Sequence, residues 1–239
     1  MFRDLAKRVL RSAGYVASRY DACRDPDAVR NSLFQTTSIN AILDVGANTG
    51  QYGDRVRRLG YRGKIVSFEP LSNAFAELDK RAAGDGNWLA EHCALGDCDG
   101  SSSINIAGNS TSSSLLGMLP RHVQAAPWSA YVGSEEIVVH KLDSLFDRYL
   151  SPSDRVFLKI DTQGFTSKVL AGAEHCLGSI KGLEVELSTV PLYEGEPLIH
   201  EVLSLLYKKG FALFYLEPEV LDDKLGQQLQ LNGLFHRVS

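Results

Sequence analysis

The stretch from Ile42 to Pro70, ILDVGANTGQYGDRVRRLGYRGKIVSFEP, limits the possible folds of this chain more than any other part of the sequence. An apolar run ends at Asp44, a glycine-spaced turn and a helical pattern follow, and a second apolar run ends at Glu69. A strand, a helix and a strand in this order form a parallel pair, because the helix carries the chain back across the sheet. We therefore expect Asp44 and Glu69 at the same edge of one sheet.

The same alternation continues to the end of the chain. We expect strands at residues 39–44, 64–69, 88–95, 155–160, 183–187, 211–216 and 228–238, and helices at 50–59, 72–83, 166–177 and 198–209. Repeated strand–helix–strand units are typical of a parallel sheet that is covered by helices. The sequence thus predicts an α/β fold with a mostly parallel, seven-stranded sheet and helices on both faces.

Residues 97–140 interrupt this alternation. The segment is rich in Ser, Gly and Asn, and only residues 102–107 alternate like a strand. Because periodic elements resume afterwards in the same style, we expect an irregular loop or lid here rather than a linker between domains. The predicted organisation is an N-terminal helical extension, residues 1–30, followed by one domain, residues 31–239.

Residues 1–20 carry apolar and basic side chains at helical spacing. The apolar positions are Phe2, Leu5, Ala6, Val9, Leu10, Ala13 and Val16, and the basic ones are Arg3, Lys7, Arg8, Arg11 and Arg19. Such an amphipathic helix can pack on the domain or on a partner subunit of a homo-oligomer. A basic amphipathic helix can also lie on an anionic membrane, so peripheral membrane contact is the second interpretation.

Charge and cysteine usage narrow the classes of function. The net charge is −4, which gives no general electrostatic case for nucleic acid binding. The four cysteines form no CxxC pair, as expected of reduced thiols in a cytoplasmic protein. No apolar run approaches the roughly 20 residues that span a bilayer, and the N-terminus lacks the pattern of a signal peptide. We therefore expect a cytoplasmic protein, with membrane contact at most peripheral.

The turn between the first two strands is suited to a nucleoside cofactor. Gly46 lets the backbone approach a ligand, and Gly50 opens the helix without side-chain bulk. A carboxylate in the position of Glu69 can accept hydrogen bonds from both ribose hydroxyls. No glycine stands two residues after Gly46, and Asp44 would face a bound pyrophosphate, so a dinucleotide is disfavoured. S-adenosylmethionine, which has a ribose and a cationic sulfonium but no phosphate, fits better.

Several motifs resemble one family throughout residues 30–239. They are LDVGANTGQYG, VSFEP, FLKIDTQGF, VLAGAE, LEVELSTVPLYEGEPL, GFALFYLEP and LQLNGLFHR, which occur in this order. The chain resembles the FkbM family of S-adenosylmethionine-dependent methyltransferases. The resemblance implies a Rossmann-like class I methyltransferase fold and methyl transfer to a hydroxyl. It also implies an acceptor that is a sugar of a glycolipid or polysaccharide, or alternatively a polyketide or peptide natural product.

The cofactor motif of the family can be placed residue by residue. It falls on Asp44, Gly46, Asn48, Gly50 and Glu69. We expect Glu69 to hold the ribose and Asn48 to contact the carboxylate or amine of the methionine moiety. Asp97 follows the third expected strand, where it either reaches the adenine amine or is an ordinary turn acid.

Two acids are candidates for the chemical step. Asp161 ends the fourth expected strand and Glu186 ends the fifth, so both stand where a ligand would lie. A sugar hydroxyl is a poor nucleophile and needs a general base within hydrogen-bond reach. The two acids can share that role, bind the acceptor or hold a divalent cation, of which we favour the metal-free interpretation. Asp161 can alternatively cap the following helix.

Acceptor contacts are expected from the loops beyond the sheet. Candidates are Gln163, Tyr193 and His140, with His122, Trp128 and residues 109–116 also near the insert. Tyr193 is expected to stack on a sugar ring. The family often has acids where Gln163 and Thr166 stand. The difference at Thr166 leaves open a subunit that binds the cofactor without catalysis.

Overall fold

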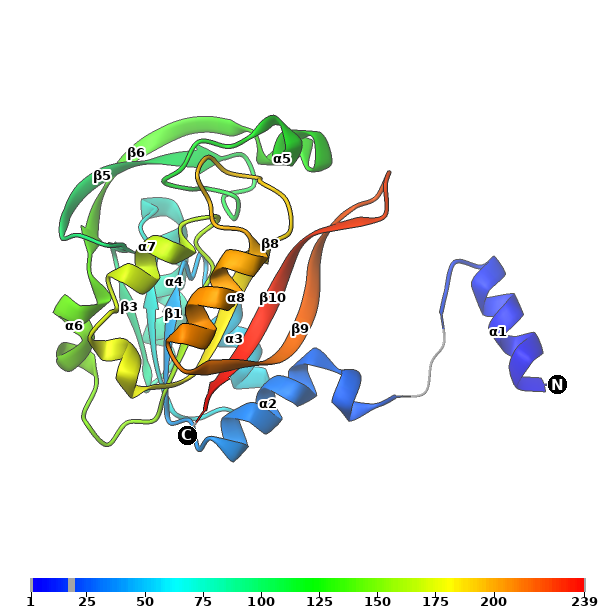
Figure 1. Cartoon of the computed structure of the whole chain (residues 1–239), viewed down its shortest axis with the longest axis horizontal. Coiled ribbons are helices and arrows are strands. Elements are labelled where there is room, and N and C mark those ends of the chain that lie inside the picture. Colours follow the sequence, from blue (N-terminus) through cyan, green and yellow to red (C-terminus); the bar gives the residue numbers. More distant parts are fainter. Residues whose placement is uncertain (1, 17–19, 239) are drawn as a thin grey trace.

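The computed structural model describes residues 2–16 and 20–238, and its core is the predicted α/β arrangement. One sheet has seven strands in the order β3-β2-β1-β7-β8-β10-β9 (Figure 1). These strands are β1 (Ala41–Val45), β2 (Lys64–Phe68), β3 (Trp88–Glu91), β7 (Val156–Ile160), β8 (Ile180–Ser188), β9 (Phe211–Asp222) and β10 (Gln227–Arg237). Of these seven strands, β10 alone runs in the opposite direction to the other six, so the fold class expected from the sequence is confirmed.

The central strand β1 brings three chain segments to one edge of the sheet. Val45 lies opposite Phe68 of β2 on one side and Ile160 of β7 on the other. The next residues along the chain, among them Glu69 and Asp161, therefore leave the sheet side by side. This is the point at which the strand order reverses, where ligands bind in open parallel sheets.

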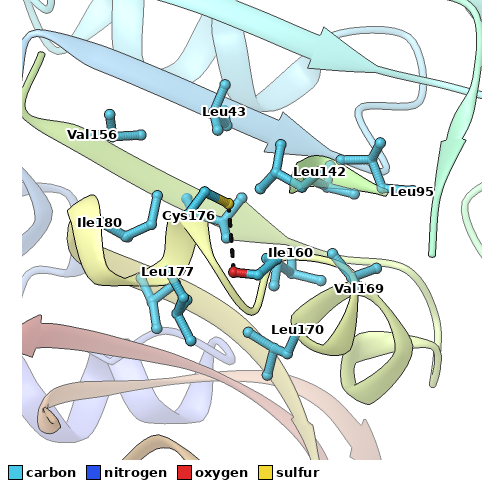
Figure 2. Packing of buried hydrophobic residues seen from close by; sticks show 14 of the residues in the cluster. Leu43, Leu95, Leu142, Val156, Ile160, Val169, Leu170, Cys176, Leu177 and Ile180 are labelled. Atoms are coloured by element: carbon cyan, nitrogen blue, oxygen red, sulfur yellow. Dashed lines mark hydrogen bonds between the residues drawn. The ribbon is translucent and has the colours of Figure 1, made fainter. Parts of the chain in front are cut away.

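Helices cover both faces of the sheet, because successive side chains along each strand point to opposite faces and those on both faces are apolar. One face packs α6 (Leu142–Tyr149), α7 (Thr166–Ala171) and α8 (Ile199–Lys208) against a cluster that includes Leu43 and Ile160 (Figure 2). The other face packs α2 (Pro26–Thr36), α3 (Gln51–Arg58) and α4 (Ser72–Ala83) around Ile42 and Phe157. The prediction of helices on both faces is confirmed.

Two predicted elements are shorter than the sequence pattern suggested. The expected strand 88–95 is divided into β3 and the short β4 (Ala94–Leu95), which belongs to a second sheet. The expected helix 166–177 ends with α7 at Ala171, and a separate 3-10 turn spans Cys176–Ser179. At Gly172, a Cβ atom would come 1.8 Å from the carbonyl oxygen of Gly96, so the chain packs too closely there for a side chain.

The segment 97–140 is largely regular, and the prediction of an irregular insert was wrong for most of it. It contains β5 (Gly100–Ala107), α5 (Pro120–Ala125) and β6 (Tyr131–His140). The strands β4, β6 and β5 form a three-stranded sheet at one end of the molecule (Figure 1). Residues 108–119 form neither helix nor strand beyond isolated bridges. The strand expected at residues 102–107 corresponds to β5, of which Ile104 and Ala107 are buried.

The N-terminal helix is shorter than predicted, and a second helix follows it. α1 spans Phe2–Ser12, and Gly14 adopts a left-handed conformation with φ of +82°. Of the predicted helix, residues 1 and 17–19 lie outside the described part of the chain. α2 was not predicted and crosses the expected domain boundary at residue 31. Asp25 caps it by accepting a hydrogen bond from the Ala28 N–H at 3.0 Å.

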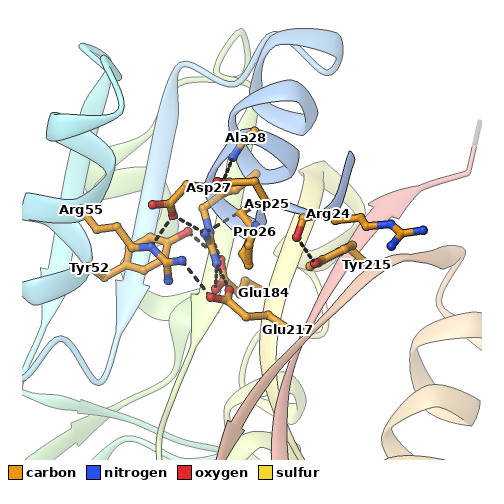
Figure 3. A network of polar contacts seen from close by, with 11 residues as sticks. Arg24, Asp25, Pro26, Asp27, Ala28, Tyr52, Arg55, Glu184, Tyr215 and Glu217 are labelled. Carbon is orange, nitrogen blue, oxygen red and sulfur yellow. Dashed lines mark hydrogen bonds and ion pairs between the residues drawn. The ribbon is translucent and has the colours of Figure 1, made fainter. Parts of the chain in front are cut away.

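Arg30 of α2 ties the N-terminal segment to the sheet. Its side chain is fully buried and donates to both carboxylate oxygens of Glu184 on β8, at 2.8 and 2.7 Å. It also donates to Glu217 at 2.7 Å, and the Tyr52 hydroxyl donates to Glu184 at 2.8 Å. Figure 3 shows Glu184, Glu217 and Tyr52 of this network. Because a buried guanidinium needs such partners, α2 is part of the folded domain.

Two further expectations concern the cysteines and the membrane. All four cysteines have free thiols, with Cys23 and Cys98 exposed and Cys93 and Cys176 buried. Within residues 2–16 and 20–238, the structure contains no helix with the length and apolar character needed to cross a membrane.

Candidate active site

The turn after β1 requires glycine at its first position. Gly46 has φ of +73°, and a Cβ atom there would lie 1.9 Å from the backbone oxygen of Asp161. Gly50 precedes α3 with φ of +91°, and a Cβ atom there would lie 3.0 Å from the side chain of Leu78 and 3.1 Å from that of Trp88. The two predicted glycines therefore let the loop pass closely between the ends of β2 and β7.

Glu69 is held by the backbone of this turn. Its carboxylate accepts hydrogen bonds from the N–H groups of Asn48, at 2.7 Å, and Leu71, at 2.9 Å. Burial raises the pKa of Glu69 to about 7, although both N–H groups act in the opposite direction. Glu69 also lines a cavity beside the turn, so its remaining lone pairs can accept hydrogen bonds from a ligand.

This first cavity, the cofactor pocket, lies between the glycine turn and the insert. Its walls include Gly46, Asn48, Glu69, Leu95, Thr111 and Asp161. Its volume is about 60 Å³, well below the ~300–1,000 Å³ of typical ligand pockets. Residues of the 108–119 segment narrow it: Ser110 Oγ accepts a hydrogen bond of 3.2 Å from Asn48 Nδ2.

The cofactor pocket suits S-adenosylmethionine in its chemistry. Glu69 offers an acceptor for ribose hydroxyls, and the bare backbone of Gly46 allows close approach of the methionine moiety. Leu71, Leu95 and Phe165 offer an apolar surface for a base. The chemistry of these residues therefore fits this cofactor.

Asp44 lies beneath the turn instead of in the pocket. It is fully buried, accepts a hydrogen bond from Ser67 Oγ at 3.1 Å, and has its Oδ1 atom 3.1 Å from the Lys159 ammonium. Lys159 also donates to the carbonyl oxygen of Gly46, at 3.1 Å. Asp44 thus holds the turn in place indirectly, because the Lys159 ammonium that it pairs with also binds the Gly46 carbonyl oxygen.

Asp97 is separated from the cofactor pocket. Its carboxylate is partly exposed and forms an ion pair of 2.7 Å with the Lys168 ammonium of α7. That hydrogen bond lowers the pKa of Asp97. This arrangement matches the alternative interpretation of an ordinary turn acid.

Asp161, Gln163 and Glu186 form one connected group at the ends of β7 and β8. Gln163 Nε2 lies 2.9 Å from Asp161 Oδ1 and 2.9 Å from Glu186 Oε1, so one amide bridges both acids. Lys159 Nζ stands 3.6 Å from Asp161 Oδ2. α7 begins only at Thr166, with Phe165 as its N-cap residue, so the capping alternative for Asp161 does not hold.

The two acids have different environments. The Asp161 side chain is 30% exposed, whereas Glu186 is buried. Burial raises the pKa of Glu186 well above its ordinary value, the negative charge of Asp161 raises it further, and the bond from Gln163 opposes both. A carboxyl with a raised pKa beside an accessible carboxylate is an arrangement suited to proton transfer.

A second cavity, the acceptor cavity, adjoins the cofactor pocket and measures about 460 Å³. The two share Gly46, Thr111, Asp161 and Gln163 as lining residues. The remaining walls of the acceptor cavity include Tyr52, His122, Trp128, Glu186, Glu219 and Asn232. Asp161 therefore lies at the border between the two cavities.

Of the histidines near the insert, the structure places His122 and not His140 at this cavity. His122 of α5 is buried, and its ring meets that of Tyr193 edge-on at 5.0 Å. Burial lowers the pKa of His122, so the ring is neutral at pH 7. His140 lies on β6, away from both cavities, 3.2 Å from the carboxylate of Asp99. The assignment of His140 to the acceptor is therefore corrected in favour of His122.

Tyr193 has a different place from the one expected. It is fully buried, so it cannot stack on a sugar ring. Its hydroxyl lies 2.7 Å from Gln163 Oε1 and 3.1 Å from the carbonyl oxygen of Ser112. Tyr193 therefore positions Gln163, and the exposed aromatic side chain at the cavity is Trp128, which is 68% accessible.

Sequence reasoning missed the contribution of the last two strands. Glu219, Gln230 and Asn232 all line the acceptor cavity. Val220 pairs with Gln230 and Pro218 pairs with Leu231, so Glu219 is the extra residue of a β-bulge. Polar residues at alternating positions in the predicted strand 228–238 were a signal that one of its faces meets a polar site. Within the part of the chain that the structure describes, no group of three or more His, Cys, Asp or Glu residues is arranged to hold a metal ion.

Comparisons with known proteins agree with this architecture. The model of the methyltransferase FkbM domain matches residues 44–213. The 2-O-methyltransferase NoeI of Sinorhizobium fredii is 26% identical over 172 residues, which are 69% of this chain and 70% of that protein. A candidate O-methyltransferase from Klebsiella pneumoniae superposes with a TM-score of 0.52 at 12% identity, over 99% of this chain and 89% of that one. This likeness supports the class I methyltransferase fold.

A further solved structure is methyltransferase FkbM from Methylobacillus flagellatus. It matches with a TM-score of 0.47 at 13% identity, over 82% of this chain. This chain covers 43% of the length of that protein.

Proposed function

The chain belongs to the FkbM methyltransferase family and is an S-adenosylmethionine-dependent methyltransferase, and we propose that its acceptor is a hydroxyl group on a sugar of a glycolipid or polysaccharide. The observation that carries the proposal is the position of Asp161. It lines both the cofactor pocket and the acceptor cavity, with Glu186 one amide bridge away. A hydroxyl that enters the acceptor cavity toward the cofactor pocket meets a carboxylate at the junction.

The roles of the residues follow from these positions. S-adenosylmethionine, when bound, supplies a methyl group on a positively charged sulfur. Glu69 would hold its ribose, and Gly46 would leave room for its methionine moiety. Asp161 would orient the acceptor hydroxyl and take its proton, while the carbon–sulfur bond of the donor would break as the methyl group passes to that oxygen, leaving the electron pair on sulfur. Lys159, 3.6 Å away, holds Asp161 in place from below.

The lining of the acceptor cavity supports a polyhydroxylated acceptor. Carboxylates such as Glu219 accept hydrogen bonds, whereas the amides of Gln230 and Asn232 both donate and accept. A sugar hydroxyl can satisfy either kind of partner. The exposed indole of Trp128 offers an aromatic face of the kind on which a sugar ring packs. The acids outnumber the basic residues in this lining, which disfavours an anionic acceptor.

Two alternatives remain within the same site. The acceptor hydroxyl can belong to a polyketide or peptide product. The name of the relative, 2-O-methyltransferase NoeI, does not distinguish such an acceptor from a sugar. The other interpretation, a cofactor-binding subunit without activity, rests on the difference at Thr166 alone. Thr166 is buried at the start of α7, away from both cavities, so its difference from the family leaves the acids at the junction in place.

The test is methyl transfer from radiolabelled S-adenosylmethionine to a panel of neutral glycolipids, oligosaccharides and hydroxylated peptides or polyketides. We expect label on a sugar acceptor, and its loss in Asp161→Asn, which keeps the shape of the side chain. S-adenosylhomocysteine should still bind this variant in a calorimetric titration. Label only on non-sugar acceptors would replace the proposed substrate, and cofactor binding without transfer to any acceptor would favour the binding subunit.

A further inference from the structure

α1 is a helix whose two faces differ sharply in chemistry. On a helical wheel, Ala6, Val9, Leu10 and Ala13 fall on one side, and Lys7, Arg8 and Arg11 fall on the other. Residues 1–20 hold five basic residues and one acid, although the whole chain has a net charge of −4. The positive charge is thus concentrated in a segment attached to a net acidic domain.

The apolar face of α1 is open to solvent. Val9 is 60% exposed and Leu10 is 37% exposed, and Tyr15 just beyond the helix is 68% exposed. Figure 1 shows α1 standing apart from the folded body. An amphipathic helix with an uncovered apolar face gains free energy when that face is buried against a partner.

We propose that α1 docks on an anionic lipid bilayer, lying in the interface with Val9 and Leu10 among the acyl chains and Lys7, Arg8 and Arg11 at the headgroups. Charge and exposed apolar area together favour this occupant. The negatively charged headgroups attract the basic face of α1, and the acyl chains beneath them can bury its exposed apolar face. This inference concerns attachment and does not depend on methyl transfer.

The dimensions of the helix agree with a position on the bilayer and not across it. α1 has 11 residues, which corresponds to a length of about 16 Å. The hydrocarbon core of a bilayer is about 30 Å thick. Tyr15 follows the helix with an amphipathic ring of the kind that is enriched at membrane–water interfaces.

Vesicle flotation of the full chain tests the proposal. We expect the protein to float with vesicles of equal parts phosphatidylglycerol and phosphatidylcholine, and not with phosphatidylcholine alone. Each basic residue near an anionic surface strengthens attraction by roughly five-fold, so Lys7→Glu/Arg8→Glu/Arg11→Glu should weaken vesicle binding by about 100-fold or more. Binding should also decline from about 0.1 M to 1 M salt, where the screening length falls from about 10 to 3 Å.

A matched control separates α1 from net charge. Arg58→Glu/Lys208→Glu/Lys224→Glu reverses three exposed charges on the folded domain and changes the net charge equally. This variant should bind vesicles nearly as well as the unmodified chain. Equal loss in both triple variants would overturn the proposal, and so would a failure of the unmodified protein to float with anionic vesicles.

A third variant tests insertion of the apolar face. Val9→Ser/Leu10→Ser keeps every charge and removes the two exposed aliphatic side chains. We expect it to lose at least ten-fold in vesicle affinity, because burial of each such side chain contributes to binding. Full retention of binding would contradict a helix that lies among the acyl chains.

Discussion

The hydroxyl of the buried Tyr193 lies 2.7 Å from the amide oxygen of Gln163. A hydroxyl that donates to this oxygen fixes which way the amide points, so Nε2 faces Asp161 and Glu186 at 2.9 Å each. A neutral donor between two carboxyl groups reduces their repulsion without adding charge. Glutamine at this position is therefore part of the electrostatics of the site.

Replacing Gln163 with Glu should change the pH dependence of the enzyme. A third carboxylate next to Asp161 and Glu186 raises the pKa values of the three neighbouring carboxyl groups, because repulsion between like charges favours their protonated forms. Since the base must be ionised to act, the acidic limb of the kcat/KM profile should move to higher pH by about one unit. Activity below pH 7 should fall accordingly.

Tyr193→Phe is the control for this prediction. It removes the bond to the amide oxygen and leaves every charge in place, so we expect a lower kcat with an unshifted acidic limb. If Gln163→Glu left the limb unmoved, or if both variants moved it equally, the electrostatic role of Gln163 would be refuted.

Cofactor binding should depend on pH through Glu69, whose buried carboxyl has a pKa of about 7. The ionised form accepts ribose hydroxyls more strongly, so affinity should rise with pH up to about 7 and level off above it. Below that value it should fall by up to about ten-fold per pH unit. Calorimetric titration with S-adenosylhomocysteine across this range measures the effect.

Glu69→Gln keeps the size of the side chain and removes its titration. Its affinity should be at least about ten-fold lower at pH 8 and independent of pH in the same range. Glu77→Gln, an exposed acid on α4 that pairs with Lys80, is the matched control and should bind as the unmodified protein does. A Glu69→Gln variant with unchanged affinity would remove Glu69 from the ribose site.

The cofactor loop could be predicted because its determinants are local. Acids that end neighbouring strands and glycines in the turn between them are both visible in the sequence, and the strand register then brings them together. The helix 72–83 was predicted with its observed bounds for the same reason, since its periodicity is uninterrupted. Neither prediction required knowledge of distant contacts.

The acceptor side could not be predicted in this way. The burial of Tyr193 depends on packing against α5 and β10. His140 lies on β6, which pairs with β4 in the three-stranded sheet, whereas His122 lies on α5, and only the tertiary structure decides which of them meets the cavity. The bulge that turns Glu219 toward the cavity is a matter of pairing between β9 and β10. Local periodicity carries no information about such tertiary contacts.

The correction from His140 to His122 gives a direct prediction. His122→Ala should raise the KM for the acceptor by about ten-fold, because one polar contact in the cavity is lost, and should leave the affinity for S-adenosylhomocysteine unchanged. His140→Ala should alter neither quantity, since His140 lies on β6 beside Asp99 and lines neither cavity. Steady-state kinetics with the sugar acceptor would contradict the assignment if the effects were reversed.

The last prediction concerns the stability of the domain and the fully buried Arg30. Burial alone would raise the pKa of Glu184, but the bonds from Arg30 lower it, so the pair is ionised. Arg30→Met leaves this carboxylate buried without its main partner and should lower the free energy of unfolding in urea by about 3–5 kcal/mol. Arg81→Met breaks the half-exposed pair with Asp54 and should cost less than about 1 kcal/mol.

A double variant distinguishes charge from packing at Arg30. In Arg30→Met/Glu184→Gln the buried charge is removed along with its partner, while the Tyr52 hydroxyl retains an oxygen to which it can donate. We expect this variant to be more stable than Arg30→Met alone by at least about 1 kcal/mol, since an unpaired buried charge costs more than a neutral amide. Equal stability of the two variants would mean that Arg30 stabilises the domain by packing α2 against the sheet and not by neutralising Glu184.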